Sequence, residues 1–408
     1  MKQVKIKELI KECERMAQNN FEIVEEIALK NQKKVLDAFR KNRISSIHFN
    51  SSNGYGYDDL GRDTLCRLYA DVFGAESSIV SPLIVSGTHA LSLALFGVLR
   101  PNDTMLSITG KPYDTLDEVI NGNGIGSLKD YNIAYKEVSL LDNGSFDWET
   151  IQKELDNKPK LVFIQRSKGY DWRDALSVYD IGKIAVKIKE IYPECIIMID
   201  NCYGEFVEEV EPTDLGADII AGSLIKNPGG GIAPTGGYIA GKECYIKQIS
   251  YRLTAPGIGM EVGSYSYGHR LYYQGLFLAP STVKNAIKGN ILGSYIFNKL
   301  GFDTQPKAAT IPKDIILGIK FHTAKELVSF CQNVQKASPV DGYVTPEPWE
   351  MPGYVHKVIM AAGTFVQGAS LELTADGAVR QPYVAYLQGG LTYEHYKIAL
   401  EELLADLI

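Results

Sequence analysis

The stretch Ala221-Gly222-Ser223-Leu224-Ile225-Lys226-Asn227-Pro228 holds the feature on which the fold prediction depends. A single lysine, Lys226, ends a short apolar run, and glycines at 229–231 and 236–237 follow it. Because glycine has no side chain, a bulky group can lie close to the backbone there. The stretch therefore predicts a cofactor held beside Lys226.

A carboxylate lies upstream of this lysine, at the end of the apolar run Ile196-Ile197-Met198-Ile199-Asp200. Open parallel sheets present functional groups at this end of their strands. Lysine, carboxylate and glycines together indicate pyridoxal phosphate chemistry. A dinucleotide site is disfavoured, because the three glycines at 229–231 lack the G-x-G-x-x-G spacing.

Strand and helix patterns alternate from about residue 79 to residue 240, which predicts a mostly parallel sheet covered by helices on both faces. Polar residues collect where the predicted strands end. Ser86, Gly87 and Thr88 open an apolar helix, whose free N–H groups and dipole would favour a phosphate. The other predicted strand ends carry Tyr113, 166–170, Asp200 and Lys226.

The chain is expected to divide into three parts: an N-terminal helical arm and loop (1–60), a large cofactor-binding domain (61–280), and a connector helix with a small C-terminal α+β domain (281–408). Residues 251–280 are rich in glycine and tyrosine, which predicts a long functional loop. In the small domain, strands are expected at Phe365, 370–373 and 383–387.

Composition narrows the possible partners. With 408 residues, 45% of them hydrophobic, the chain can bury a large core. A net charge of -7 gives no footprint for nucleic acid or for an anionic membrane. No apolar run approaches the roughly 18 residues of a membrane span, and six scattered cysteines match neither a disulfide framework nor a metal site. A cytoplasmic protein is expected.

Taken in order, these features resemble the fold type I pyridoxal-phosphate enzymes, specifically the cystathionine and methionine lyase group. More narrowly, the chain is similar to the bacterial aluminium-resistance family, described as methionine gamma-lyase-like or as cystathionine beta-lyases. The resemblance runs from about Tyr55 to the C-terminus. The stretches that carry it most specifically are 54–62, 164–167, 200–205, 223–226 and 383–391.

The resemblance implies three catalytic residues. Lys226 would form the Schiff base with the cofactor and later shuttle the substrate's alpha proton, a role that suits an amine whose pKa falls when it is desolvated. Asp200 would pair with the pyridinium nitrogen and keep it protonated. Tyr113 would stack on the cofactor ring.

The resemblance also implies how the cofactor phosphate is held. The expected contacts within one chain are Ser86, Gly87, Thr88 and Ser223. In the related lyases a tyrosine and an arginine of a neighbouring subunit reach the phosphate as well, which implies a homodimer or homotetramer with shared active sites. The corresponding residues here are Tyr55, Tyr57 and Arg62, and either tyrosine could make the contact.

Two positions depart from the lyase pattern. Ile225 stands where those enzymes usually carry a threonine, which removes one phosphate contact. The arginine that binds the substrate carboxylate falls near Tyr386, which cannot replace a bidentate guanidinium. Arg380 is the first substitute and Arg166 the second.

The function implied is a pyridoxal-phosphate-dependent carbon–sulfur lyase. It would act on a sulfur amino acid through an external aldimine, by elimination of the cystathionine beta-lyase or methionine gamma-lyase type. An aminotransferase or an aldolase shares the first steps and remains an alternative. A different class is a catalytically silent protein of this fold involved in metal tolerance.

Overall fold

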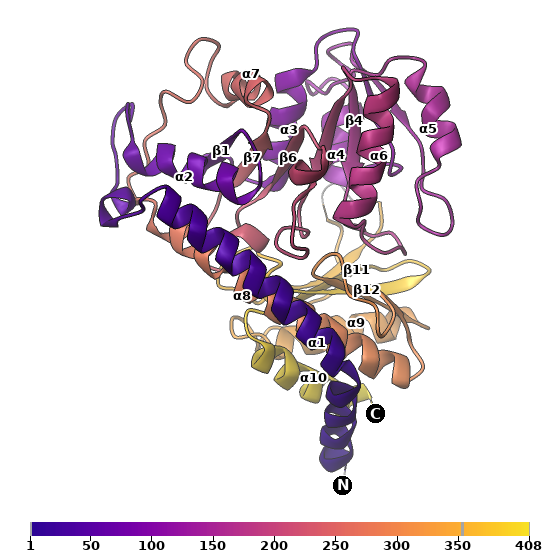
Figure 1. Ribbon diagram of the computed structural model, residues 1–408. Helices are drawn as coiled ribbons and strands as arrows, with labels where there is room; N and C mark the ends of the chain where they lie inside the picture. The colour runs from indigo at the N-terminus through magenta and orange to yellow at the C-terminus, as the bar shows by residue number, and fades with distance from the viewer. Residues whose placement is uncertain (1, 352–354, 408) are drawn as a thin grey trace.

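The computed structural model describes residues 2–351 and 355–407 (Figure 1). Two sheets organise the chain. A seven-stranded sheet lies in the upper part of the view, and a five-stranded sheet lies below it with the C-terminal helices. The mixture of strands and helices, with a large and mainly parallel sheet, confirms the predicted α/β class.

The large sheet has the strand order β1-β7-β6-β5-β4-β2-β3. Strand β7 runs antiparallel to both of its neighbours, whereas the pairs among β6, β5, β4, β2 and β3 are parallel. The strands are β1 Ser77–Ser81, β2 Thr104–Ser107, β3 Ala134–Glu137, β4 Leu161–Gln165, β5 Ile196–Asp200, β6 Ile219–Ser223 and β7 Gly237–Gly241.

Both faces of this sheet are buried, as a parallel sheet requires. Along β5, Ile197 and Ile199 belong to the core on one face, whereas Ile196 and Met198 belong to the core on the other. The first face is covered by α2 Leu60–Val72, α5 Trp148–Leu155 and α6 Val178–Ile191. The second face is covered by α3 Gly87–Val98, α4 Asp114–Asn121 and α7 Glu243–Leu253.

Two long helices connect the halves of the molecule. Helix α1 (Lys2–Lys41) lies along α8 (Arg270–Lys299) over much of its length (Figure 1). The N-terminal segment is therefore one helix packed on its own chain, anchored where the Asn31 side chain donates to the carbonyls of Phe206 and Glu208. Helix α8 begins at Arg270 rather than at the expected Ser281, so much of the predicted loop at 251–280 is helical.

The small sheet is antiparallel, with the order β10-β11-β12-β9-β8. Its strands are β8 Asp303–Gln305, β9 Ile316–Phe321, β10 Val358–Ala361, β11 Thr374–Ala378 and β12 Tyr383–Gln388, and its helices are α9 Ala324–Lys336 and α10 Tyr393–Leu407. The strands expected at Phe365 and 370–373 are wrong, because the backbone N–H groups of Phe365 and Val366 bond to the Glu372 carboxylate and not to another strand.

Short 3₁₀ turns complete the described chain: η1 Ser46–Phe49, η2 Pro212–Leu215 and η3 Asn227–Gly229. Although α1 has 40 residues and α8 has 30, no helix in the described ranges combines the length and apolar character needed to cross a membrane.

Candidate active site

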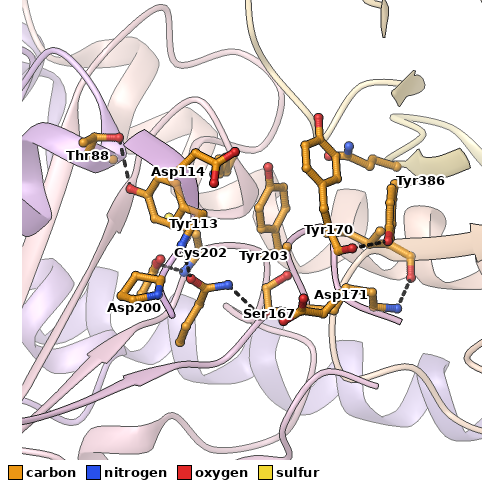
Figure 2. A pocket seen from close by; sticks show the side chains of 18 of the residues that line it. Thr88, Tyr113, Asp114, Ser167, Tyr170, Asp171, Asp200, Cys202, Tyr203 and Tyr386 are labelled. Atoms are coloured by element: carbon orange, nitrogen blue, oxygen red, sulfur yellow. Dashed lines mark hydrogen bonds between the residues drawn. The ribbon is translucent and has the colours of Figure 1, made fainter. Parts of the chain in front are cut away.

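One cavity lies where β4, β5 and β6 end, between the large sheet and the small one (Figure 2). Because these strands are parallel, their last residues Gln165, Asp200 and Ser223 emerge at the same edge. The cavity brings together eight residues named from the sequence: Ser86, Gly87, Thr88, Tyr113, Asp200, Ser223, Lys226 and Arg380.

The N-terminus of α3 forms one wall of this cavity. Ser86 is the N-cap, and its side chain accepts a hydrogen bond from the backbone N–H of His89 at 3.0 Å. A Cβ on Gly87 would lie 3.3 Å from the Cys202 Sγ and 3.4 Å from the Ser223 Cβ. The helix start and the end of β6 are therefore nearly in contact, which gathers hydroxyl and N–H donors suited to a phosphate.

Asp200 ends β5 and is 5% exposed. Its Oδ1 accepts a hydrogen bond from the backbone N–H of Cys202 at 3.1 Å. Burial raises the pKa of this carboxyl, and the nearby Lys226 opposes that shift. A buried carboxylate at a cavity wall calls for a cationic partner in the cavity.

Lys226 follows β6, and its Nζ lies 3.9 Å from the centroid of the Tyr203 ring. Burial alone would lower the pKa of the lysine. The acidic groups around it, Asp200 among them, outweigh this effect and raise the pKa well above its ordinary value. The sequence analysis expected desolvation to lower the pKa of Lys226, but the structure gives a raised pKa.

Tyr113 stands at the start of α4 and faces the N-terminus of α3. Its hydroxyl lies 3.0 Å from the Thr88 Oγ1, and its backbone N–H donates to the Gln165 side chain at 3.0 Å (Figure 2). Burial raises the pKa of its phenol, so the ring stays neutral. Tyr113 is thus held between α3 and β4, at the rim of the space beside Asp200.

The opposite wall comes from the small sheet and from the segment after β4. The Tyr386 hydroxyl donates to the Tyr170 carbonyl at 2.6 Å, which joins β12 to that segment (Figure 2). Arg380 lines the same wall, exposed at the rim, and its charge acts on both Tyr386 and Asp171. Tyr386 lies near the position where the lyases carry their carboxylate-binding arginine. Arg380 supplies a guanidinium on the same wall of the cavity.

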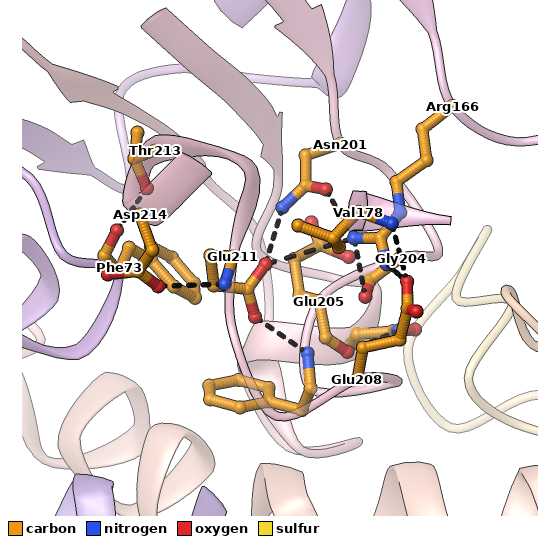
Figure 3. A network of polar contacts seen from close by, with 12 residues as sticks. Phe73, Arg166, Val178, Asn201, Gly204, Glu205, Glu208, Glu211, Thr213 and Asp214 are labelled. Atoms are coloured by element: carbon orange, nitrogen blue, oxygen red, sulfur yellow. Dashed lines mark hydrogen bonds and ion pairs between the residues drawn. The ribbon is translucent and has the colours of Figure 1, made fainter. Parts of the chain in front are cut away.

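Arg166 is not available to a substrate, which corrects its assignment as the second carboxylate-binding candidate. Its side chain is fully buried, is not part of the cavity lining, and lies in a network of polar contacts (Figure 3). The guanidinium pairs with Glu208 at 2.9 Å and donates to the Asn201 side chain and the Gly204 carbonyl. These contacts join the end of β4 to the segment after β5, where the chain turns at 201–206. The Arg166 side chain therefore stabilises the fold.

Tyr55, Tyr57 and Arg62 do not line the cavity of their own chain. The two tyrosines are 72% and 65% exposed and contact each other, with ring centroids 5.6 Å apart. Arg62 holds this loop in place, because its guanidinium donates to the Gly56 carbonyl and pairs with Asp63, each at 2.8 Å.

Several cavity residues were not assigned a role from the sequence, although Lys168 lies in the stretch 166–170 named there. Tyr203 has a left-handed backbone, with φ of 72°, and its ring lies under Lys226. Lys168 is buried and donates to the carbonyls of Gln305 and Ile316. Asp376 and Gln388 arrive from β11 and β12, which no local pattern could place opposite Lys226.

The arrangement fits pyridoxal 5'-phosphate. An amine that can condense with the aldehyde, a buried carboxylate for the ring nitrogen and a helix N-terminus for the phosphate lie around one cavity. Ile225 lines the cavity with an aliphatic side chain, so the hydroxyl expected beside the lysine is absent there. The fold and the site define a fold type I pyridoxal-phosphate enzyme.

The chain belongs to the methionine gamma-lyase family, whose model matches residues 6–408. It is 52% identical over 380 residues to the Bacillus subtilis protein YnbB, an uncharacterized protein, covering 92% of this chain and 90% of that one. It is also 22% identical over 202 residues, 48% of this chain and 46% of the other, to an L-methionine gamma-lyase of Treponema denticola.

Solved structures agree with the family. A carbon-sulfur lyase involved in aluminum resistance from Clostridium novyi is 50% identical, with a TM-score of 0.95 over 99% of this chain and 96% of that one. A candidate cystathionine beta-lyase involved in aluminum resistance from Listeria monocytogenes is 51% identical, with a TM-score of 0.97 over 98% of this chain and 100% of that one. The family resemblance seen in the sequence is confirmed.

Proposed function

We propose that this chain is a carbon–sulfur lyase that eliminates a thiol from a sulfur amino acid. The observation that carries the proposal is the meeting of Lys226, Asp200 and the N-terminus of α3 around one cavity, with Arg380 on its opposite wall. The names of the related proteins support the same reaction class.

Pyridoxal phosphate, when bound, supplies an electron sink for a carbanion at the substrate's alpha carbon. The residues of this chain hold it there. Ser86, Gly87, Thr88 and Ser223 bind the phosphate with hydroxyl and backbone donors. Asp200 keeps a proton on the ring nitrogen, because its buried carboxylate is stabilised by a positive partner.

Lys226 provides the amine that binds the cofactor aldehyde and then moves the proton of the substrate's alpha carbon. Its Nζ lies 3.9 Å from the centroid of the Tyr203 ring, which would stabilise the ammonium form of the amine. Tyr113, held by Thr88 and Gln165, would stack on the cofactor ring.

Arg380 binds the substrate's alpha-carboxylate. It is the arginine that reaches the cavity from the small sheet, and Asp171 and Tyr386 lie close enough for their pKa values to respond to its charge. A guanidinium with its five donors can grip a carboxylate in two places, which fixes the alpha carbon relative to Lys226.

We further propose that a second copy of the chain places the loop containing Tyr55, Tyr57 and Arg62 at the phosphate. Two exposed tyrosines in contact with each other are unusual for a free surface. A pair of inactive variants, Tyr55→Ala/Tyr57→Ala and Lys226→Ala, should regain activity on mixing if sites are shared. Failure to complement would place each site within one chain.

The lyase proposal is tested by incubating the holoenzyme with cystathionine or methionine and measuring free thiol together with pyruvate or 2-oxobutyrate. Stoichiometric thiol and keto acid are expected from at least one of them. Arg380→Lys should raise KM more than it lowers kcat, because the charge remains while the bidentate grip is lost. Keto acid formed without thiol, or no product from any sulfur amino acid, would refute the assignment.

A further inference from the structure

A buried lysine joins the two sheets of the molecule beside the cavity. Lys168 follows β4 of the large sheet, is 1% exposed and belongs to the cavity lining. Its Nζ donates to the carbonyl of Gln305, the last residue of β8, and to that of Ile316, the first residue of β9, each at 3.0 Å. The Asp314 Oδ1 lies 3.7 Å away. One ammonium group therefore ties the end of a large-sheet strand to two strands of the small sheet.

The aspartate beside this ammonium is also held from both sheets. Asp314 is 1% exposed, and its Oδ1 accepts the backbone N–H of Ile316 at 3.0 Å. Its Oδ2 accepts the hydroxyl of Ser167, the residue before Lys168, at 3.1 Å. A buried ion pair adds little to stability, because the desolvation of two charges offsets their attraction, but it can fix one arrangement of the groups around it. The arrangement fixed here is that of the two sheets.

The small sheet carries the held position onward to Arg380. Strand β9 pairs with β12, and Ile316 lies opposite Gln388 in that pairing. Arg380 lies in the turn between β11 and β12 and lines the cavity. The Tyr386 hydroxyl of β12 donates to the carbonyl of Tyr170, in the same segment as Lys168 (Figure 2). The wall that carries Arg380 is therefore attached to the segment after β4 at two places.

The same segment is also attached to the cofactor side of the cavity. Gln165 ends β4, and its side chain accepts the backbone N–H of Tyr113 at 3.0 Å and donates to the Ser167 carbonyl at 3.3 Å. Lys168 is the next residue after Ser167. A shift of the small sheet against this segment would move Arg380 relative to the cofactor-binding amine. A bidentate grip on a carboxylate requires that this distance be constant.

We propose that Lys168 is a positioning residue, whose ammonium holds Arg380 at one distance from the cofactor site through Ile316 and the β9–β12 pairing. The proposal rests on the role proposed above for Arg380, which is to bind the substrate's alpha-carboxylate. Lys168 acts through backbone carbonyls and needs no contact with the substrate. Without its ammonium, β8 and β9 lose this donor and Asp314 loses its charge partner, so the small sheet is no longer held in one position.

The test is a double-mutant cycle between Lys168→Met and Arg380→Met, with glycine as the probe. Glycine has the alpha-amino and alpha-carboxylate groups but no leaving group, so it binds without elimination. Its Kd is measured from the shift of the visible absorbance band of the holoenzyme. Lys168→Met should raise this Kd about tenfold in the wild-type background and less than about twofold beside Arg380→Met, because effects that act through one contact are not additive.

Lys189→Met is the matched control. Lys189 also donates to two backbone carbonyls, those of Pro193 and Cys195, and also pairs with a buried aspartate, Asp218, at 2.7 Å. These four residues lie outside the described lining of the cavity. The control should therefore leave the Kd for glycine unchanged in both backgrounds. Asp314→Asn serves as the second variant if Lys168→Met does not fold, and it should show the same dependence on Arg380.

The outcomes separate this inference from the proposed function. Equal losses of affinity in both backgrounds, or a Kd that Lys168→Met leaves unchanged, would overturn the positioning role and leave Arg380 as assigned. If Arg380→Met binds glycine as tightly as the wild type, both the role of Arg380 and this inference fail. If the cycle shows the expected coupling but no sulfur amino acid yields thiol, the lyase reaction alone is refuted.

Discussion

The Lys226 Nζ lies 3.9 Å from the ring centroid of Tyr203, a residue whose backbone is left-handed, with φ of 72°. For a residue with a Cβ that conformation costs roughly 1–2 kcal/mol. The turn after β5 is therefore strained at Tyr203, the residue whose ring lies under the amine of Lys226.

A change at Tyr203 should alter how Lys226 ionises. Tyr203→Leu removes the aromatic face, worth about 0.5–2 kcal/mol to a cation, so the pKa of Lys226 should fall. Apoprotein carrying this change should bind pyridoxal phosphate covalently faster at a fixed pH near neutrality, because more of the amine is unprotonated. Tyr203→Phe keeps the ring and should match the wild type. Identical behaviour of the Leu and Phe variants would show that the ring does not act on the amine.

Three lysines, Lys111, Lys168 and Lys226, are among the described residues that line the cavity, and only Lys226 should bind the cofactor. Lys226→Ala should lose the visible absorbance band and thiol release together, because the other lysines among the described lining residues are engaged: Lys168 donates to two carbonyls, and Lys111 pairs with Asp117. Lys168→Met should keep the band, since Lys168 donates to two carbonyls. Borohydride reduction followed by peptide mass spectrometry identifies the labelled residue. A label on Lys168 would contradict the assignment.

Replacing Arg166 should lower the free energy of unfolding more than it lowers the catalytic activity of the folded protein. Arg166→Met leaves Glu208 buried, with Lys313 at 3.0 Å as its remaining ion-pair partner among the described residues. Removing one partner of a buried pair costs about 3–5 kcal/mol, and Lys313 should hold the loss in unfolding free energy near the lower figure. Urea denaturation measures this loss in unfolding free energy. The double variant Arg166→Met/Glu208→Gln should recover part of the lost stability, because it no longer buries an unpaired carboxylate. A fully stable Arg166→Met protein that no longer binds substrate would instead support Arg166 as a residue that binds the substrate carboxylate.

Glu205 should make stability depend on pH. Burial raises the pKa of this carboxyl from its ordinary 4.5 to about 8, while the Tyr238 hydroxyl donates to its Oε1 at 2.7 Å. A raised carboxyl pKa favours the protonated form in the folded state. Its contribution is therefore complete below pH 4.5 and is lost as the pH rises toward 8, at up to about 1.4 kcal/mol per pH unit.

The matched variant for this prediction is Glu205→Gln, which keeps an acceptor for Tyr238 but cannot ionise. Unfolding free energies of wild type and variant, measured by denaturant titration across this range, should diverge as the pH rises, with the variant falling less. Parallel curves would mean that Glu205 does not titrate in the folded protein.

Much of the large sheet could be predicted because its strands are short apolar runs that end in polar residues. Ile196–Asp200 and the run before Lys226 show this pattern, and parallel strands bring such ends to one edge. The helix opened by Ser86 was equally visible, because capping is a local property.

The small sheet was harder to predict. Its short strands lie among turns, and the segment at 370–373 has an apolar alternation without a pairing partner. Helix α8 begins eleven residues before its expected start at Ser281, because tyrosines and glycines of a predicted loop pack instead against neighbouring segments; Tyr273, for one, donates to the Gly61 carbonyl.

The sequence by itself determined the chemistry of the site: one lysine after an apolar run, one aspartate at a strand end, and small residues before a helix. These are local signals, since each depends on a few adjacent residues. The tertiary structure alone decided that Arg166 turns into a buried acidic network, that Tyr203 lies under Lys226, and that Asp376 and Gln388 face them from another sheet. Such choices depend on which distant segments pack together, and burial and pairing across the whole fold decide them.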